Sequence, residues 1–481
     1  MHIISKYYII LFFIPFNLFS QKQGNVWYFG NYAGVDFNGG TPVALTNGQL
    51  TWPAGQQHIE GTSAISDSSG AILFYSNGMT VWDKSHQIMQ NGTGLLGSFS
   101  TTQSSIIVPR PFSDTYFYLF TVAGGCCPNN ISDGFRYSAI DMCANGGLGE
   151  VVTTEKNIKL IDSITEKVAA TRHSNGTDYW ILTHTKYNKF YAFQLSTSGI
   201  TNTVVSSIGS NHSAAGQGQL KISPNGQKIA IGSSSTPGLL ELFDFDKTTG
   251  IVSNPISLNR MYNGNIYGVE FSPNNSILYT FSWSYSSPLG MYISQYDISS
   301  GNPTIINASL NLILSIPNIV NGHGMQIANN GKIYLTSFAD NYSLASINNP
   351  NTYGLGCNFQ DPSVSLLGNS GFSSLPSFIS NYDYSNKMAN SCATAINSID
   401  KSEIKTLVYP NPNSGSFKVQ IDSRINNVEI IIINSIGQKV FEQKISNGEN
   451  KINTDFLANG LYNYIILSDK KQISNGKLMI E

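Results

Sequence analysis

The sequence predicts an all-β protein: a β-propeller of about seven blades over residues 21–380, then a small immunoglobulin-like β-sandwich over residues 407–481. A strand–turn–strand pattern recurs along the first region at intervals of about 50 residues. A chain of 481 residues is too long for one core of average size but suits a large and a small β domain. Its 25 Tyr and 25 Phe are residue types that strands favour.

Residues 1–20 have the composition of a signal peptide. A short basic start precedes the apolar run Tyr7–Phe16, and the small residue Ser20 lies before polar Gln21, where we expect cleavage. A membrane-anchoring helix is the alternative, but the run is short and Pro15 interrupts it. No other segment is apolar enough to cross a membrane as a helix. The leader therefore predicts export.

The repeat is clearest in three stretches, each with two apolar strands around an Asn- or Gly-containing turn: Leu220–Ile231, Val269–Tyr279 and Met325–Leu335. A second set of turns recurs at a spacing of 51 residues: Gly199, Gly250 and Gly301. The gap between the turns at Gly70 and Gly176 is twice the period, which predicts a further copy near residues 113–122.

Four-stranded units at this period are typical of a β-propeller. A lone twisted sheet leaves both faces exposed, whereas radial stacking covers each face with a neighbouring sheet. We expect the N-terminal strand Val26–Phe29 to close the ring by pairing into the last blade. A solenoid or a pair of sandwiches is the alternative arrangement.

Four stretches of the first region also resemble a known family: Asn25–Phe37, Glu60–Asp67, Gly78–Asp83 and Thr102–Pro109. They are similar to the WD40-like propeller region that precedes sorting or gliding-motility C-terminal domains in Bacteroidetes surface proteins. The resemblance implies a fold and a cellular location but indicates little about a reaction or a ligand. Residues 381–406 are rich in Ser and Asn and lack periodicity, so we interpret them as a linker.

Residues 407–481 alternate apolar and polar residues in short strands separated by Asn-Gly turns, so an ordinary immunoglobulin-like module would also fit. The opening and closing motifs point further, because they resemble the type A C-terminal sorting domain of type IX secretion substrates. The residues that carry this resemblance are Pro410, Asn411, Pro412, Gly415, Gly460, Tyr462, Gly476 and Lys477. It implies recognition by the type IX machinery at the outer membrane, removal of the tail by a processing peptidase, and a body that is secreted or surface-attached.

The charge excludes one class of partner. The net charge is −2 and only 12% of residues are charged, so no basic face for nucleic acid is expected. Four histidines and one tryptophan fall near strand ends and are candidates for a ligand-binding face: His173, His184, His212, His323 and Trp180. Polar loop positions for the histidines and core packing for the tryptophan are the alternatives.

No catalytic residue, catalytic metal site or cofactor is predicted, because the sequence contains no HExxH or GxSxG motif and no phosphate-binding glycine loop. Structural calcium is the one ion that the Asn- and Asp-rich turns could hold. Export permits disulfides among the cysteines Cys126, Cys127, Cys143, Cys357 and Cys392. Cys126 or Cys127 with Cys143 would close a short loop, but the sequence leaves the pairing open.

Two functions remain. The first is a secreted or surface-attached binding or adhesion protein that uses a propeller face for an extracellular glycan or protein. The second is a secreted propeller enzyme, a lyase or hydrolase that acts on polysaccharide. Fold alone does not choose between them. The lack of a recognisable catalytic motif favours binding and leaves enzymatic activity open.

Overall fold

The computed structural model describes residues 22–51, 60–123, 134–212, 216–234, 238–319, 322–373, 375–380, 392, 406–421, 427–434, 438–468 and 471–481. It divides the chain into two compact units, Met1–Cys392 and Ala393–Glu481. The predicted signal peptide and its cleavage site between Ser20 and Gln21 lie outside the described residues.

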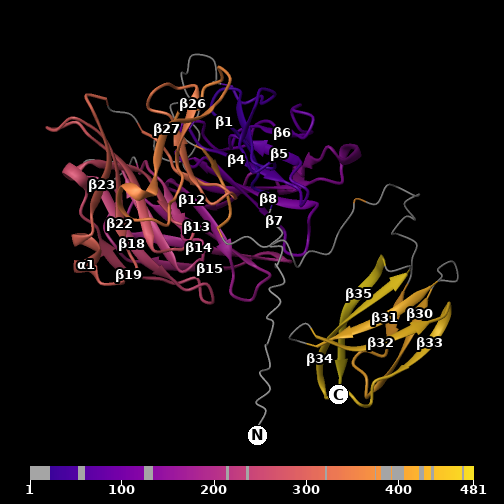
Figure 1. Ribbon diagram of the computed structural model, residues 1–481. Helices are drawn as coiled ribbons and strands as arrows, with labels where there is room; N and C mark the ends of the chain where they lie inside the picture. Colours follow the sequence, from indigo (N-terminus) through magenta and orange to yellow (C-terminus); the bar gives the residue numbers. More distant parts are fainter. Residues whose placement is uncertain are drawn as a thin grey trace, which may run out of the picture. The chain divides into compact units, whose positions relative to one another are not determined.

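The predicted all-β class is confirmed (Figure 1). The first unit begins with three small sheets. They are β1–β3 (Val26–Phe29, Ala33–Asp36, Val43–Leu45); β4–β6 (Thr62–Ser66, Ile72–Ser76, Val81–Asp83); and β7–β11 (Ser105–Pro109, Tyr116–Ala123, Gly134–Asp141, Glu150–Val151, Ile158–Ile161). Each follows the previous one directly along the chain.

Four further sheets follow, each an antiparallel run of four consecutive strands. They are β12–β15 (Ile164–Arg172, Tyr179–Thr185, Lys189–Ser196, Gly199–Ser207); β16–β19 (Leu220–Ile222, Lys228–Ser233, Leu239–Phe245, Val252–Ser257); β20–β23 (Asn265–Phe271, Ile277–Ser284, Gly290–Asp297, Asn311–Pro317); and β24–β27 (Gln326–Ile327, Ile333–Thr336, Ser343–Ile347, Phe359–Ser365). One α-helix is described, α1 (Pro303–Ala308), whose N-cap Asn302 accepts a hydrogen bond from the Thr304 backbone N–H.

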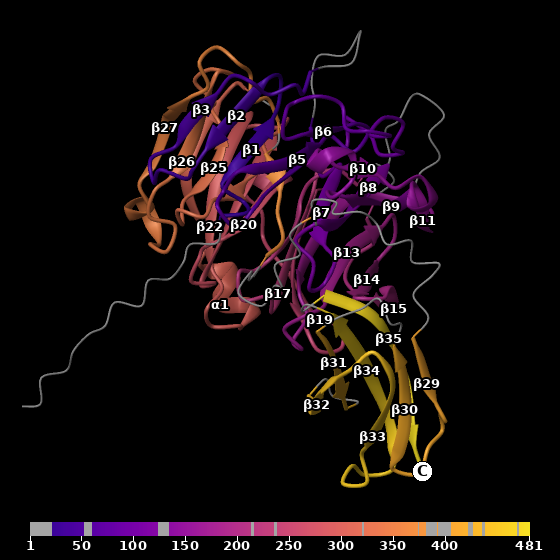
Figure 2. The ribbon, with the colours of Figure 1, turned by 90° about the vertical axis from the view of Figure 1, so that its right-hand side faces the viewer.

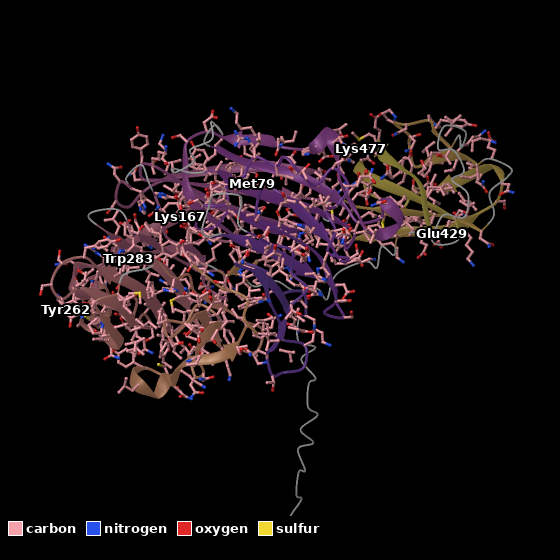
Figure 3. All side chains as sticks on the ribbon, turned by 90° about the horizontal axis from the view of Figure 1, so that it is seen from above. Met79, Lys167, Tyr262, Trp283, Glu429 and Lys477 are labelled. Atoms are coloured by element: carbon pink, nitrogen blue, oxygen red, sulfur yellow. A yellow bond between two sulfur atoms is a disulfide. The ribbon has the colours of Figure 1, made fainter. Side chains whose placement is uncertain are left out.

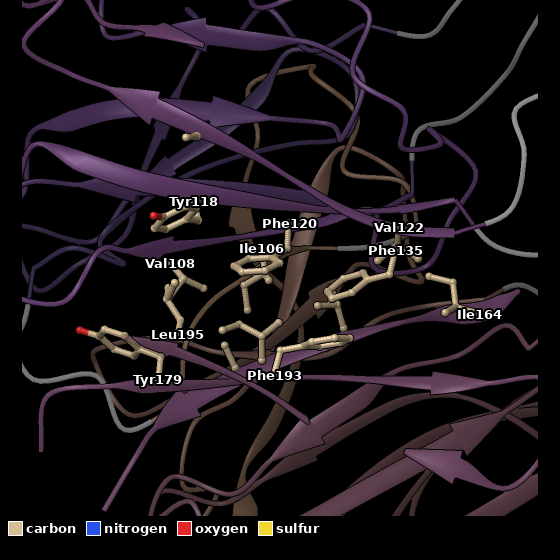
Figure 4. Packing of buried hydrophobic residues seen from close by; sticks show 14 residues of the cluster. Ile106, Val108, Tyr118, Phe120, Val122, Phe135, Ile164, Tyr179, Phe193 and Leu195 are labelled. Carbon is tan, nitrogen blue, oxygen red and sulfur yellow. The ribbon is translucent and has the colours of Figure 1, made fainter. Parts of the chain in front are cut away.

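Neighbouring sheets share their cores. Each of seven apolar clusters draws residues from two successive sheets, and one of them joins the first sheet to the last. In that cluster Trp27 and Phe29 of β1 pack with Tyr334 of β25 and Leu344 of β26, and Figure 2 shows β1–β3 beside β25–β27. Figure 4 shows another, in which Phe120 and Phe135 meet Phe193 across two sheets. Both faces of the sheets are thereby covered.

The expectation that Val26–Phe29 pairs into the last sheet is wrong. Gly30, at φ +57°, reverses the chain, so that β1 pairs with β2 and begins a sheet of its own. The joining segment comes instead from residues 370–380. Ser370 bridges Asn31, and β28 (Pro376–Ser377) pairs in parallel with β4.

Beyond β28 the chain crosses two more sheets. The Ser380 N–H donates to the Ala170 carbonyl of β12, and its hydroxyl donates to the Ile222 carbonyl of β16, both at 2.8 Å. Cys392 then forms a disulfide with Cys143, a residue 249 positions earlier. The sequence had offered Cys126 or Cys127 as the partner of Cys143. The structure replaces that pairing, and those two cysteines lie outside the described residues.

In six of the seven sheets the first strand begins at one common end, which we call the loop end. The first sheet is the exception, because β1 begins at the opposite end and the β1–β2 turn lies at the loop end. There the Gly61 N–H donates to the Thr101 carbonyl and the Gln103 N–H to the Glu166 carbonyl, across neighbouring sheets. Because strands within a sheet are antiparallel, the connection from the second to the third strand of each of these six sheets returns to this end.

The tight turns between first and second strands meet at the opposite end, which we call the turn end. The Asn225 N–H donates to the Asn275 side-chain carbonyl of the next turn at 2.8 Å, and the Asn329 amide donates to that of Asn25 at 2.6 Å. The Met142 N–H, next to Cys143, donates to Thr115 in one of these turns. The disulfide therefore lies at the turn end.

The second unit contains seven strands in two sheets, β29-β30-β33 and β32-β31-β34-β35. Their bounds are β29 Leu407–Tyr409, β30 Ser416–Ile421, β31 Val428–Ile433, β32 Lys439–Ile445, β33 Gly448–Asn453, β34 Gly460–Ser468 and β35 Lys471–Ile480. Side chains alternate between core and surface, so that Phe417, Val419 and Ile421 meet Ile430 and Ile432 in a single core.

Candidate functional site

Of the predicted ligand-face residues, His184 and His212 are brought together at the loop end. Their ring centroids are 4.2 Å apart, and both side chains are buried. Burial lowers the pKa of both imidazoles, and the neighbouring ring lowers that of His184 further, so both are neutral at pH 7. The Glu241 carboxylate lies 3.6 Å from the His212 Nε2 and accepts hydrogen bonds from Ser210.

The other three candidates do not contact this pair. His323 is buried against Phe281 and Phe338, and burial alone lowers its pKa to about 3. His173, in the turn that follows β12, packs against Trp180 with the ring centroids 5.4 Å apart and the planes tilted by 31°. The Trp180 indole is 1% exposed and belongs to the core between two sheets. The five residues therefore form no single surface.

A buried charged cluster at the loop end was not predicted as a site. The Tyr267 hydroxyl donates to Glu60 at 2.6 Å, while the Thr102 hydroxyl and N–H donate to Glu166 at 2.9 and 3.0 Å. The Lys167 ammonium donates to the carbonyls of residues 216 and 217. Two adjacent charges inside the strand Ile164–Arg172 were the sequence signal for it.

Burial shifts the charges of this cluster towards neutrality. Desolvation, reinforced by Glu166, raises the pKa of Glu60 to about 8. Desolvation lowers the pKa of Lys167 to about 7, although Glu166 opposes this shift. Groups with pKa values near 7 could exchange protons, but Glu166 and Lys167 have no exposed surface through which a substrate would reach them. The shifted pKa values of the cluster make the stability of the fold depend on pH.

The substitution Glu60→Gln should flatten the dependence of stability on pH. The folded-state pKa of Glu60, about 8, lies above the ordinary value of 4.5, so its stabilising contribution is complete below pH 4.5 and declines as pH rises to about 8. Between about pH 5 and 7 we expect the free energy of unfolding of the wild-type chain to fall by on the order of 2 kcal/mol, a loss that the variant does not show. Thermal unfolding at both pH values measures this.

The exposed carboxylate Asp162, whose side chain is 71% accessible, provides the matched control. Asp162→Asn should leave the wild-type pH profile between about pH 5 and 7 unchanged, because exposed charges are well solvated. If the stability of the Glu60→Gln variant fell as steeply with pH as that of the wild type, Glu60 would not be the group responsible for the pH dependence.

A cavity of about 310 Å³ opens near the turn end, among the first strands. Lys221 on its wall donates to Glu270 at 3.0 Å and to Gln326 at 2.5 Å, so the buried charges are paired. Phe378, from the segment that crosses the sheets, also lines it. Residues before β1, residues of several first strands and residues 378–380 of the crossing segment thus line the cavity together.

Exposed tyrosines gather at the loop end. Five of the six exposed tyrosines described in the first unit lie there: Tyr32 (41%), Tyr187 (67%), Tyr262 (45%), Tyr285 (69%) and Tyr342 (54%). Figure 3 shows Tyr262 at the periphery of the unit. The sixth, Tyr353, is 45% exposed and lies between β26 and β27 at the turn end. Sequence reasoning did not single out these tyrosines, because exposure depends on which loops the sheets leave uncovered.

In the second unit, the opening and closing motifs are bonded to each other. The Asn411 amide donates to the Lys477 carbonyl at 2.7 Å, and the Met479 N–H donates back to Asn411 at 2.9 Å. The Asn413 N–H and amide both donate to the Met479 carbonyl, and its own side-chain oxygen accepts from Gly415. The two prolines of the predicted sorting signal flank Asn411: Pro410 and Pro412.

The other signal residues shape the two long strands between these motifs. Gly460 opens β34 opposite Ile480, and Tyr462 is buried beside it in the core. At Gly476 a Cβ would lie 2.6 Å from the Tyr464 hydroxyl, so only glycine fits unless that ring moves. The eight signal residues thus lie in two places: in the paired strands β34 and β35, and in the opening segment that is hydrogen-bonded to β35.

Residues 407–481 match the family described as "Secretion system C-terminal sorting domain". This part of the chain is a sorting domain of the type IX secretion system. The sorting domain makes the protein a type IX secretion substrate, which interacts with the secretion machinery and is exported to the cell surface or the extracellular space. Within the described ranges, no helix has the length and hydropathy that a bilayer crossing requires.

No curated protein matches the chain. Among solved structures, a candidate 6-phosphogluconolactonase from Bacteroides uniformis is similar at 12% identity and a TM-score of 0.42, over 71% of this chain and 98% of that one. A second, from Bacteroides fragilis, is similar at 11% identity and a TM-score of 0.44, over 73% of this chain and 96% of that one. PorZ, a surface component of the type IX secretion system of Porphyromonas gingivalis, is similar at 11% identity and a TM-score of 0.30, over 94% of this chain and 68% of that one.

Proposed function

We propose that residues 21–380 form a closed seven-bladed β-propeller that binds an extracellular glycan or protein through its loop end. The sorting domain delivers this propeller to the cell surface, where the processing peptidase of the secretion system removes the domain. The body then remains attached to the surface or is released. Residues 1–20 act as the signal peptide for the preceding export step.

Closure of the ring is supported by the order of the shared cores. Seven sheets succeed one another along the chain, and each packs on the next. The cluster around Trp27 adds the contact between the last sheet and the first. A solenoid would leave those two sheets with an uncovered face each, at a large cost in exposed apolar surface.

Binding is supported chiefly by the exposed tyrosines at the loop end. A tyrosine ring offers apolar area together with a hydroxyl, and it loses little conformational entropy on binding, so tyrosine is enriched in recognition surfaces. Two of the five, Tyr32 and Tyr262, also have φ values of 60° and 51°, a region that is uncommon for bulky residues. Such backbone strain is characteristic of functional loops.

The test is a binding array of glycans and matrix proteins, probed with the full chain lacking only residues 1–20. We expect at least one ligand, with its affinity reduced by about tenfold or more in the double variant Tyr285→Ser, Tyr342→Ser, since each ring contributes about 0.5–1.5 kcal/mol. The turn-end variant Tyr353→Ser is the matched control and should bind as the wild type does. Equal loss in both variants, or binding that the loop-end variant keeps, would overturn the proposal.

A further inference from the structure

Four of the loop-end tyrosines occupy one continuous arc of the first unit. Tyr262 and Tyr285 flank strands of the sheet β20–β23, Tyr342 lies between β25 and β26, and Tyr32 lies between β1 and β2. These three sheets are neighbours, because shared cores join the second to the first and the third to the second. We call these four residues the tyrosine arc.

The arc is almost free of charge. The loop-end segments that carry or separate its tyrosines include residues 29–33, 258–264, 285–289, 318–319, 322–325, 337–342, 366–373 and 375, and only Arg260 and Asp340 among them are charged. Both charges are engaged locally: the Arg260 guanidinium donates to the carbonyls of residues 263 and 264, and Asp340 accepts from the Tyr342 N–H. The same segments are rich in Asn, Ser and Gly.

The sheets outside the arc differ in this respect. Charged residues recur in the turns of the sheets outside the arc: Asp67, Arg110, Asp114, Arg172, Asp178, Asp246 and Lys247. In the turn-end turns of the three sheets of the arc, Lys332 is the one charged residue. The low charge is therefore a feature of the turns and loops of these three sheets and not merely the average of a chain with 12% charged residues.

We infer that the ligand of the tyrosine arc is an uncharged polysaccharide, an inference that rests on the proposed binding function. Aromatic rings pack against the apolar C–H faces of sugars, and hydroxyl and amide side chains bond sugar hydroxyls as both donors and acceptors. A polyanion would need several unpaired cations, which these segments lack. Rings as exposed as Tyr285, at 69%, cover one face of a sugar without enclosing it, and several in an arc suit an extended polymer.

The experiment measures the affinity of the full chain, without residues 1–20, for neutral polymers (mannan, dextran, mixed-linkage β-glucan) and for anionic ones (alginate, heparin). Each measurement is made at about 50 mM and about 500 mM NaCl. We expect binding to a neutral polymer that changes by less than about twofold between the two salt concentrations, because screening acts only on charges.

Two variants link this binding to the arc. The double variant Tyr285→Ser, Tyr342→Ser should bind the neutral polymer about tenfold more weakly or worse, whereas Tyr285→Phe, Tyr342→Phe should stay within about threefold because it keeps both rings. Salt-sensitive binding to anionic polymers only, or binding to a protein only, would overturn the inference and leave the proposed function intact. Binding to none of the polymers or proteins, or binding that both double variants retain, would overturn both.

Discussion

Deleting Lys477–Glu481 is expected to leave folded protein in the periplasm. The deleted residues form the end of β35, where Leu478 and Ile480 are 0% and 3% exposed in the core of the sorting domain. They also hold the carbonyl groups to which Asn411 and Asn413 donate. The truncation therefore removes two core side chains and releases the opening motif, while the first unit keeps its own cores.

The measurement is the fraction of protein accessible to protease on intact cells, compared with the fraction in the periplasmic extract. We expect the accessible fraction to fall to background for the truncation. Met479→Ala, at a position that is 36% exposed, keeps the strand and its backbone hydrogen bonds and should be exported normally. Truncated protein at the cell surface in normal amount would show that the closing strand is not needed for sorting.

Replacing Trp27 by alanine should destabilise the first unit by about 3–5 kcal/mol. The indole is fully buried, lies 4.6 Å from Phe37 and 5.8 Å from Phe378 between ring centroids, and donates from Nε1 to the Gly24 carbonyl at 2.8 Å. Its contacts join the first sheet, the last sheet and the late crossing segment. The loss should therefore lower the stability of the whole proposed ring in one transition.

Urea unfolding followed by far-ultraviolet circular dichroism measures this change without relying on the fluorescence of the removed indole. Tyr187→Ala, at a position that is 67% exposed, is the control and should change the free energy of unfolding by less than about 0.5 kcal/mol. A loss below about 1 kcal/mol for Trp27→Ala, or a separate early transition confined to the N-terminal sheet, would contradict closure through this cluster.

Local turn chemistry accounts for what the sequence could predict of the fold. The turn centres Gly176, Gly226 and Asn275 have φ values of 78°, 75° and 64°, so the Asn and Gly at these positions mark a backbone that other residues rarely adopt. The copy predicted near residues 113–122 is also present, as the turn before β8 and β8 itself. In the second unit, the motif residues were identifiable through their resemblance to type A sorting domains, which the match over residues 407–481 confirms.

Long-range contacts account for what could not be predicted. Glu166 and Lys167 are charged residues in a strand, and hydrogen bonds with Thr102 and residue 216, from the segments that precede β7 and β16, compensate for their burial. The partner of Cys143 lies 249 residues away, so proximity in the sequence favoured the wrong loop. The strand Val26–Phe29 pairs with its own hairpin partner because of Gly30, a local feature that the expectation of ring closure overlooked.

The disulfide at the turn end has a mechanical consequence. Any pull on the chain beyond Cys392, during translocation or while the protein is tethered, reaches the folded body at Cys143. Without that bond, the load would pass to Ser380 and to the two-residue ladder between β28 and β4, which could be opened one hydrogen bond at a time. The disulfide therefore protects the pairing of β28 with β4, which joins the early and late parts of the chain, against force applied to the C-terminal segment.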